Sequence, residues 1–182
     1  MDAAVARRLI ALAGHGIGTP FIKGGKHQLD PKIAGYNVAA RHTPWLVLRD
    51  LDNDAPCGGA LVDRLVAERH PDLLLRVATR EVEAWLLADR EACADFLAVP
   101  VGRIPEAPEA LDNPKQRLVQ LAAGSRRRGV RQALVPRPGS SRQVGPEYTT
   151  EVSAFVGADW SPERAAAAAP SLARAIHRLS RL

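Results

Sequence analysis

The chain has 182 residues and a formal net charge of +5, a length that fits one domain, or one domain with a small appendage. Its hydrophobic fraction of 46% is ordinary for a globular protein with a packed core. No apolar run reaches the roughly 18 residues that a membrane span requires, and the N-terminus, with Arg7 and Arg8 in its apolar stretch, lacks a signal-peptide pattern. We therefore expect a cytoplasmic protein without a membrane partner, in which Cys57 and Cys93 remain reduced.

The first part of the chain alternates between amphipathic helices and short apolar strands. In chain order the pattern predicts a helix over 2–13, a strand over 17–22, a turn at 23–26, a helix over 29–40, a strand over 45–49, a helix from 57 to about 69, a strand over 73–78, and helices over 80–89 and 90–97. The strands over 45–49 and 73–78 are continuous apolar runs, as is typical of strands covered on both faces. This alternation predicts an α/β fold with a small, mostly parallel sheet flanked by helices.

The second part of the chain is expected to be a helical extension. We divide the chain into an α/β domain over residues 1–99 and a helical, loop-rich extension over 100–182 that packs on the same core. A Pro-rich connection over 100–113 leads to a helix over 114–123 and then to an irregular segment over 125–146. Helices over 151–156 and 171–182 follow, with a short helix-prone stretch at 165–169 between them.

Three aspartates follow the strand over 45–49 and form the most informative feature of the sequence. Asp50 and Asp52 are two residues apart, so along a strand they share a face. They lie at the carboxyl end of a predicted parallel strand, where open α/β sheets bind their ligands. Carboxylate oxygens are the ligands that Mg²⁺ prefers, and a cation also relieves their mutual repulsion. The sequence therefore predicts a Mg²⁺ site at Asp50 and Asp52; the alternative is a solvated turn or helix cap, our assignment for Asp54.

A second acidic pair follows the strand over 73–78, at the same predicted edge of the sheet. In a regular helix Glu81 and Glu83 are about 200° apart, so only one of them can face an ion. We favour Glu83, and we expect Trp85 to belong to the core. The alternative for both carboxylates is a favourable position in the first turn of a helix, where negative charge interacts with the helix dipole.

Basic residues provide candidate phosphate contacts in three places. Lys23 and Lys26 flank two glycines in a turn that lacks the form of a P-loop but can contact phosphate. Lys115 lies at a predicted helix start, where an anion is favoured, although pairing with a nearby carboxylate is an equal alternative. The third place is an arginine-rich irregular segment that begins with Arg126, Arg127 and Arg128. It can follow a nucleic-acid backbone, or it can be a solvated loop. Net charge alone does not decide between these alternatives, because arginine-rich composition also typifies GC-rich genomes.

Several segments together resemble a bacterial protein family. The matching segments are Trp45-Leu-Val-Leu-Arg-Asp-Leu-Asp52, Arg80-Glu-Val-Glu-Ala-Trp-Leu-Leu-Ala-Asp89, Asp112-Asn-Pro-Lys115, Gly145-Pro-Glu-Tyr148 and Pro170-Ser-Leu172. They resemble domain-of-unknown-function family 4276, which is regarded as distantly related to Toprim (topoisomerase–primase) domains. The resemblance covers most of the chain, and the second segment is fairly specific to the family.

This resemblance implies a Toprim-like fold and phosphodiester or phosphoryl-transfer chemistry on DNA or RNA. Toprim domains carry an Asp-x-Asp after one strand and a Glu after an earlier strand, so the resemblance implies that Asp50 and Asp52 bind Mg²⁺. The sequence departs from this pattern because it starts in a predicted helix, with Asp2 as the only nearby acid. We expect the first strand and its glutamate to be missing, either because the start lies upstream or because this member has lost its general acid/base.

Two functions follow as expectations. The first is a Mg²⁺-dependent, nuclease-like enzyme acting on nucleic-acid phosphodiesters, with Asp50 and Asp52 as ligands and Glu81 or Glu83 assisting. The second is a catalytically degenerate module that binds nucleic acid or a partner protein. Tyr148 is expected to have a packing role in either case.

Overall fold

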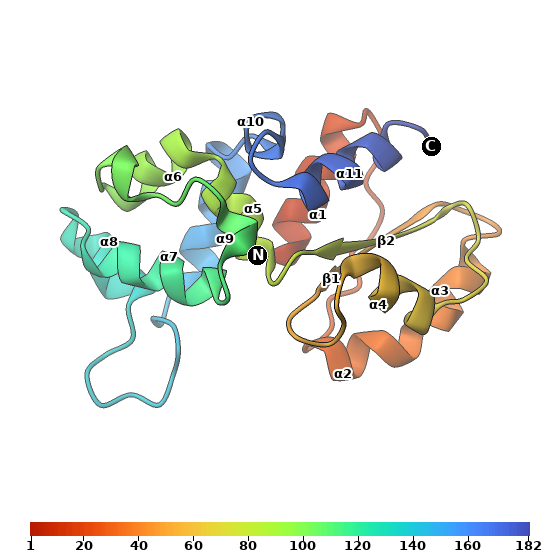
Figure 1. Ribbon diagram of the computed structural model, residues 1–182, viewed down its shortest axis with the longest axis horizontal. Helices are drawn as coiled ribbons and strands as arrows, with labels where there is room; N and C mark the ends of the chain where they lie inside the picture. The colour runs from red at the N-terminus through yellow and green to blue at the C-terminus, as the bar shows by residue number, and fades with distance from the viewer.

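Only two segments of the chain form strands, and they pair in parallel. In a computed structural model that describes residues 1–182, β1 (Trp45–Asp50) places Trp45 opposite Leu73 and Asp50 opposite Ala78 of β2 (Leu73–Ala78). The helix α4 (Gly58–Leu65) lies in the crossover between them, as parallel strands require. The predicted α/β class and both strands are confirmed (Figure 1). The strand predicted over 17–22 was wrong, because this segment pairs with neither strand and forms no regular structure.

The two faces of the sheet pack against different sets of residues, as the alternation of side chains along a strand dictates. On one face, Val47 and Leu75 join Ile33 in a core of six buried residues beneath α3 (Ile33–Ala39) and α4. On the other face, Leu74 and Ala78 belong to a core of 30 buried residues. The helices α1 (Asp2–Leu12) and α11 (Pro170–Leu179) contact the sheet through this larger core. The sheet is therefore covered on both faces, which explains the continuous apolar runs of its strands.

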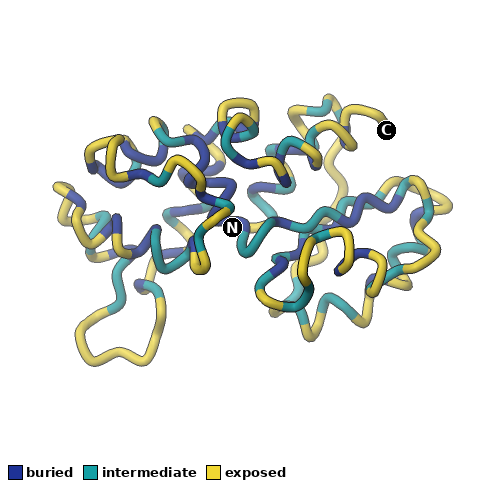
Figure 2. The backbone as a smooth tube through the Cα atoms, in the orientation of Figure 1, coloured by how far each residue is buried: buried dark blue, intermediate teal, exposed yellow.

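The larger core is organised around α5 (Val82–Ala88), in which every residue is buried (Figure 2). Trp85 of this helix is fully buried, as expected, and its carbonyl accepts a hydrogen bond from the Trp160 indole at 3.2 Å. The helices that surround α5 are α6 (Arg90–Leu97), α7 (Pro114–Ala123), α9 (Tyr148–Ala158), α10 (Pro162–Ala166) and α11. Residues from both halves of the chain thus share one core.

Two of the remaining helices differ from the prediction, one in its end and one in its existence. The helix predicted from 57 to about 69 ends at Leu65, because Asn37 holds the Glu68 carbonyl and the His70 N–H in hydrogen bonds of 2.8 Å. The predicted irregular segment over 125–146 contains α8 (Arg128–Leu134), whose buried Leu134 packs into the larger core. A short helix α2 (Lys26–Leu29) follows the basic turn, and 3₁₀ turns occur at Asp30–Lys32, Val101–Arg103 and Pro108–Ala110.

The helices of the structure are too short or too polar to cross a membrane. The longest of them, α1 and α9, have 11 residues each. Neither cysteine is in a disulfide, with Cys57 exposed and Cys93 buried.

Ser171 joins three elements at the start of α11. Its hydroxyl oxygen accepts hydrogen bonds from the Trp85 indole at 2.7 Å and from the Thr79 N–H at 3.3 Å. The hydroxyl and the backbone N–H of Ser171 both donate to the Glu109 carboxylate. This residue therefore ties α11 to the end of β2 and to α5.

Ser171→Ala is expected to lower the free energy of unfolding by roughly 1–3 kcal/mol, because it leaves the buried Trp85 indole N–H without an acceptor. Urea unfolding followed by tryptophan fluorescence measures the change. Ser180→Ala, near the end of the same helix, is the control, since its hydroxyl bonds the His177 carbonyl at the surface. Equal effects of the two substitutions would contradict the prediction.

Candidate functional site

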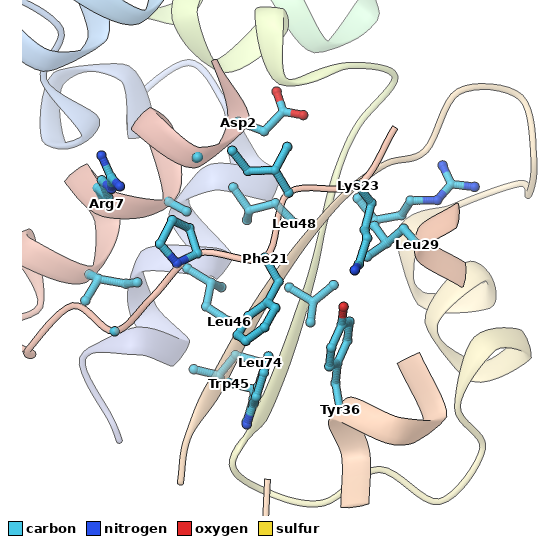
Figure 3. Close-up of a pocket in the computed structure, with 18 of the residues that line it drawn as sticks. Asp2, Arg7, Phe21, Lys23, Leu29, Tyr36, Trp45, Leu46, Leu48 and Leu74 are labelled. Atoms are coloured by element: carbon cyan, nitrogen blue, oxygen red, sulfur yellow. The ribbon is translucent and has the colours of Figure 1, made fainter. Parts of the chain in front are cut away.

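A cavity of about 1000 Å³ lies along β1 and reaches the acidic edge of the sheet. Figure 3 shows Leu46 and Leu48 of β1 and Phe21 of the preceding segment on its walls. Several charged side chains also line it, among them Asp2, Asp50, Asp52, Lys23, Lys26 and Lys115. An apolar cavity with a few charged groups is the usual form of a substrate site.

Asp50 is the partly buried acid of this edge. It ends β1, and its carboxylate accepts a hydrogen bond of 2.9 Å from the N–H of Val82, the first residue of α5. Burial, and then the negative charge of Glu83, raise the pKa of Asp50 to about 7. Asp50 is therefore divided between its protonated and charged forms near neutral pH.

Glu83 is fully buried within α5. Its Oε1 accepts a hydrogen bond from the Tyr148 hydroxyl at 3.0 Å and lies 3.6 Å from Lys115 Nζ. Burial raises the pKa of this carboxyl above its ordinary value. Its Oε2 is buried and has no hydrogen-bond partner within the protein. Unpartnered buried oxygens are uncommon and mark positions where a cation or a hydrogen-bond donor is stabilised.

Lys115 bridges the two glutamates of the second acidic pair. Its backbone N–H and its Nζ donate to Glu81 at 2.8 and 3.2 Å, while the same Nζ faces Glu83. Both glutamates face one cation because α5 begins at Val82 and Glu81 has an extended backbone, so the helical separation assumed from the sequence does not apply. Burial alone would lower the pKa of Lys115, but the charges of Glu83 and Glu81 raise it. Lys115 thus stays protonated.

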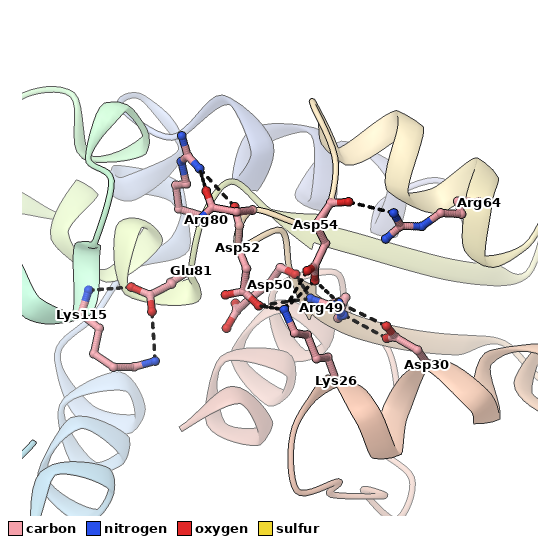
Figure 4. A network of polar contacts seen from close by, with 11 residues as sticks. Lys26, Asp30, Arg49, Asp50, Asp52, Asp54, Arg64, Arg80, Glu81 and Lys115 are labelled. Atoms are coloured by element: carbon pink, nitrogen blue, oxygen red, sulfur yellow. Dashed lines mark hydrogen bonds and ion pairs between the residues drawn. The ribbon is translucent and has the colours of Figure 1, made fainter. Parts of the chain in front are cut away.

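Asp52 and Asp54 belong to a separate, neutralised group (Figure 4). Lys26 Nζ lies 3.1 Å from Asp52 and 2.7 Å from Asp54, and the buried Arg49 guanidinium lies 2.5 Å from Asp54. Lys26 and Arg49 lower the pKa of Asp54 to about 2. The strand ends at Asp50, and Asp52 has a left-handed backbone with φ of 49°, so the alternation that would place both on one face stops between them.

The structure places five of the predicted site residues in the lining of the cavity, whereas Glu81, Glu83 and the arginine triplet lie outside that lining. Asp50, Asp52, Lys23, Lys26 and Lys115 all line the cavity. The arginine triplet instead lies around the start of α8, far from β1 in Figure 1, with all three side chains exposed. The triplet is Arg126, Arg127 and Arg128.

Two residues of the site had little signal in the sequence. Tyr148 is buried as expected for packing, but its hydroxyl also donates to Glu83 from a helix 65 positions along the chain. Arg49 was visible only as a charge at the end of an apolar run, and it ion-pairs with Asp30 at 2.9 Å as well as with Asp54. The contacts of Tyr148 with Glu83 and of Arg49 with Asp30 join residues far apart in the sequence, and the contact of Arg49 with Asp54 depends on the turn after β1. Spacing along the chain therefore does not reveal them.

No set of three or more His, Cys, Asp or Glu side chains lies in metal-binding geometry. Mg²⁺, however, is commonly held by one or two carboxylates together with waters and substrate phosphates. Asp50 and Glu83 are two carboxylates at this edge, and Glu83 Oε2 has no hydrogen-bond partner. They are therefore the residues that could hold a metal ion here.

Comparison with known proteins identifies no relative. No protein-family model matches the chain, and no curated protein or solved structure matches it. The resemblance to the Toprim-related family stays a prediction.

Asp50→Asn is expected to change how stability depends on pH. The folded-state pKa of about 7 lies above the ordinary 3.8, so the folded protein gains from protonated Asp50 at low pH and loses this gain as pH rises toward 7 and beyond. Asn keeps an acceptor for the Val82 N–H and removes the charge. In EDTA, the variant should match wild type near pH 4 and be more stable by up to about 4 kcal/mol near pH 8.

Urea unfolding across this pH range provides the measurement. The control is Asp63→Asn, which removes an exposed carboxylate of α4 that makes no ion pair. If wild type and Asp50→Asn show the same free energy of unfolding at every pH, the raised pKa of Asp50 is contradicted.

Proposed function

We propose that the protein is a Mg²⁺-dependent enzyme acting on nucleic-acid phosphodiester bonds, with Asp50 and Glu83 as its metal-binding carboxylates. The observation that carries this proposal is the fully buried Glu83, which has an unpartnered oxygen and whose charge raises the pKa of Asp50. Two repelling carboxylates of this kind are stabilised in their charged forms by a divalent cation. Their position at the carboxyl end of parallel strands is where α/β sheets bind ligands.

The neighbouring cations suit a phosphate-bearing substrate. Lys115 is held in place by Glu81 and Glu83, and its positive charge also favours the charged form of Asp50. Lys23 adds positive charge along the wall, and Lys26, which is paired with Asp52 and Asp54, contributes N–H donors. Such groups attract and orient a phosphodiester. When bound, Mg²⁺ stabilises charge on the phosphoryl oxygens and activates a water or hydroxyl.

The Toprim resemblance supports the same chemistry with a different ligand set. It implies Asp50 and Asp52 as the metal ligands, whereas Asp52 is engaged by Lys26 and Arg49. We therefore assign the metal to Asp50 and Glu83 and propose that Asp52 positions Lys26 at the cavity. Glu81 fixes Lys115 through its hydrogen bond to the backbone N–H at the start of α7.

Calorimetric titration with Mg²⁺ or Mn²⁺ near pH 8 tests the metal site directly. Wild type is expected to bind the ion and to cleave a labelled oligonucleotide only in its presence. Asp50→Asn and Glu83→Gln should each weaken metal binding by at least about tenfold, since each removes one charged ligand, and should abolish cleavage.

Asp63→Asn is again the matched control, and it should bind metal like wild type. Circular dichroism separates lost binding from lost folding, because Asn and Gln keep the hydrogen-bond acceptors of the original side chains. Absence of metal binding in wild type, or full binding by both variants, would refute the proposal.

The ion pairs of Asp52 and Asp54 favour a second candidate, a module that binds nucleic acid or a partner protein without a metal. Lys26 and Arg49 already neutralise these aspartates, so this part of the acidic edge is stable without a cation. In that case phosphate contacts would come from exposed arginines such as the triplet at 126–128.

For this second candidate, changing Arg126, Arg127 and Arg128 together to Ala is expected to weaken oligonucleotide binding, because each lost phosphate contact reduces counterion release. Binding should be indifferent to EDTA and fall with salt. Fluorescence anisotropy in EDTA measures both properties. Binding that the triple substitution leaves unaltered would count against a role for this segment.

A further inference from the structure

Three arginines gather on the face of the sheet opposite α3 and α4, outside the cavity, and a fourth, Arg69, lies just before β2 beside α3. Arg76 lies on β2, in the alternation that also turns Leu74 and Ala78 toward α11. Arg174 and Arg178 are one turn apart on the exposed side of α11, which packs on β2. Arg69 precedes β2 and is also exposed. None of the four makes an ion pair or a side-chain hydrogen bond.

Arg76 is the most unusual of the four, because it is partly buried and its Nε is buried without a hydrogen-bond partner. Burial, followed by the like charges of Arg69, Arg178 and Arg174, lowers its pKa to about 10. No carboxylate contributes to this shift. A partly buried guanidinium surrounded by positive charge is unfavourable for the protein alone. An anion bound there relieves both the repulsion and the unpartnered donor.

The cluster extends from the candidate site to the opposite end of β2. Ser171, at the start of α11, bonds the Thr79 N–H just beyond β2, so α11 starts at the acidic edge. From there α11 runs back along the strand, as Figure 1 shows, and carries Arg174 and then Arg178 away from that edge. Arg69 lies at the other end, where it lines a polar pocket of about 290 Å³ that also contains Asn37, Arg41, Glu68 and His70. Repeated positive charges along a line match a repeating polyanion better than a single small anion.

We propose that Arg69, Arg76, Arg174 and Arg178 form a track that binds the phosphate backbone of the nucleic acid on which the Asp50–Glu83 site acts. This inference rests on the proposed function for the identity of the polyanion. It assigns the main backbone contacts to the β2–α11 surface rather than to the arginine triplet at 126–128. Arginine suits this role because one guanidinium group can donate two parallel hydrogen bonds to two oxygens of the same phosphate.

The test measures binding of a fluorescein-labelled single-stranded 20-nucleotide DNA to the full chain by anisotropy, in EDTA so that no metal-dependent cleavage occurs. Arg174→Ala/Arg178→Ala should weaken binding at least about tenfold and reduce the slope of log K against log salt by about 1.4, the value for two lost single-strand phosphate contacts. The variant should stay folded, since both positions are exposed on a helix that Ala favours.

Lys32→Ala/Arg103→Ala is the charge-matched control, because both side chains are exposed and unpaired and lie outside the track. It should bind within about twofold of wild type. Equal losses in the two double variants would show that net charge governs binding and would overturn the track. Absence of DNA binding by wild type at about 50 mM KCl would overturn it as well.

Arg76→Met distinguishes a role of this arginine in DNA binding from a role in stability. It should weaken DNA binding about tenfold while leaving the melting temperature equal to or above that of wild type, because the substitution removes a partly buried, repelled charge. A fall in melting temperature with unchanged binding would overturn its place in the track. Metal titration reports on the Asp50–Glu83 site independently, so failure of the track and failure of the proposed enzyme give different results.

Discussion

The complete burial of α5 is the constraint on which the rest of the structure depends. All seven residues of this helix are buried, and Glu83 is among them. A charged side chain in such a position must find partners, and it does so in Tyr148 from α9 and Lys115 from α7. The same helix begins where its first N–H bonds Asp50. Packing of one apolar helix thus brings two carboxyl groups, an ammonium group and a phenol to the end of the sheet.

The acidic residues at the end of the sheet form two groups with different electrostatic surroundings. Asp52 and Asp54 are exposed enough to be neutralised by Lys26 and by the guanidinium of Arg49. Asp50 and Glu83 are only partly compensated: burial and the charge of Glu83 raise the pKa of Asp50, and burial and the charge of Glu81 raise the pKa of Glu83. Uncompensated charge is costly to a folded protein, so its retention is typical of a functional site. The arginines on β2 and α11 are likewise uncompensated, and burial together with the neighbouring positive charges lowers the pKa of Arg76.

The sequence by itself determined the α/β class, the two strands and most helix positions, because these follow from local apolar patterns. The helices over 90–97 and 114–123 have the expected bounds. The sequence also indicated the acidic edge, because the carboxyl ends of parallel strands lie at the same edge of a sheet. Where prediction failed, a long-range contact decided the outcome. Asn37 ends α4 early, and burial of Leu134 stabilises α8 in an arginine-rich segment.

Only the tertiary structure decided which acids act together. Spacing paired Asp50 with Asp52, but the left-handed turn at Asp52 directs that residue to Lys26 and leaves Asp50 beside Glu83. The bridge from Glu81 to Lys115 joins positions 34 apart, and the bond from Tyr148 to Glu83 joins positions 65 apart. Periodicity reports only on neighbours within a turn or a strand. Contacts over such distances arise from the packing of α7 and α9 around α5, which only the folded chain specifies.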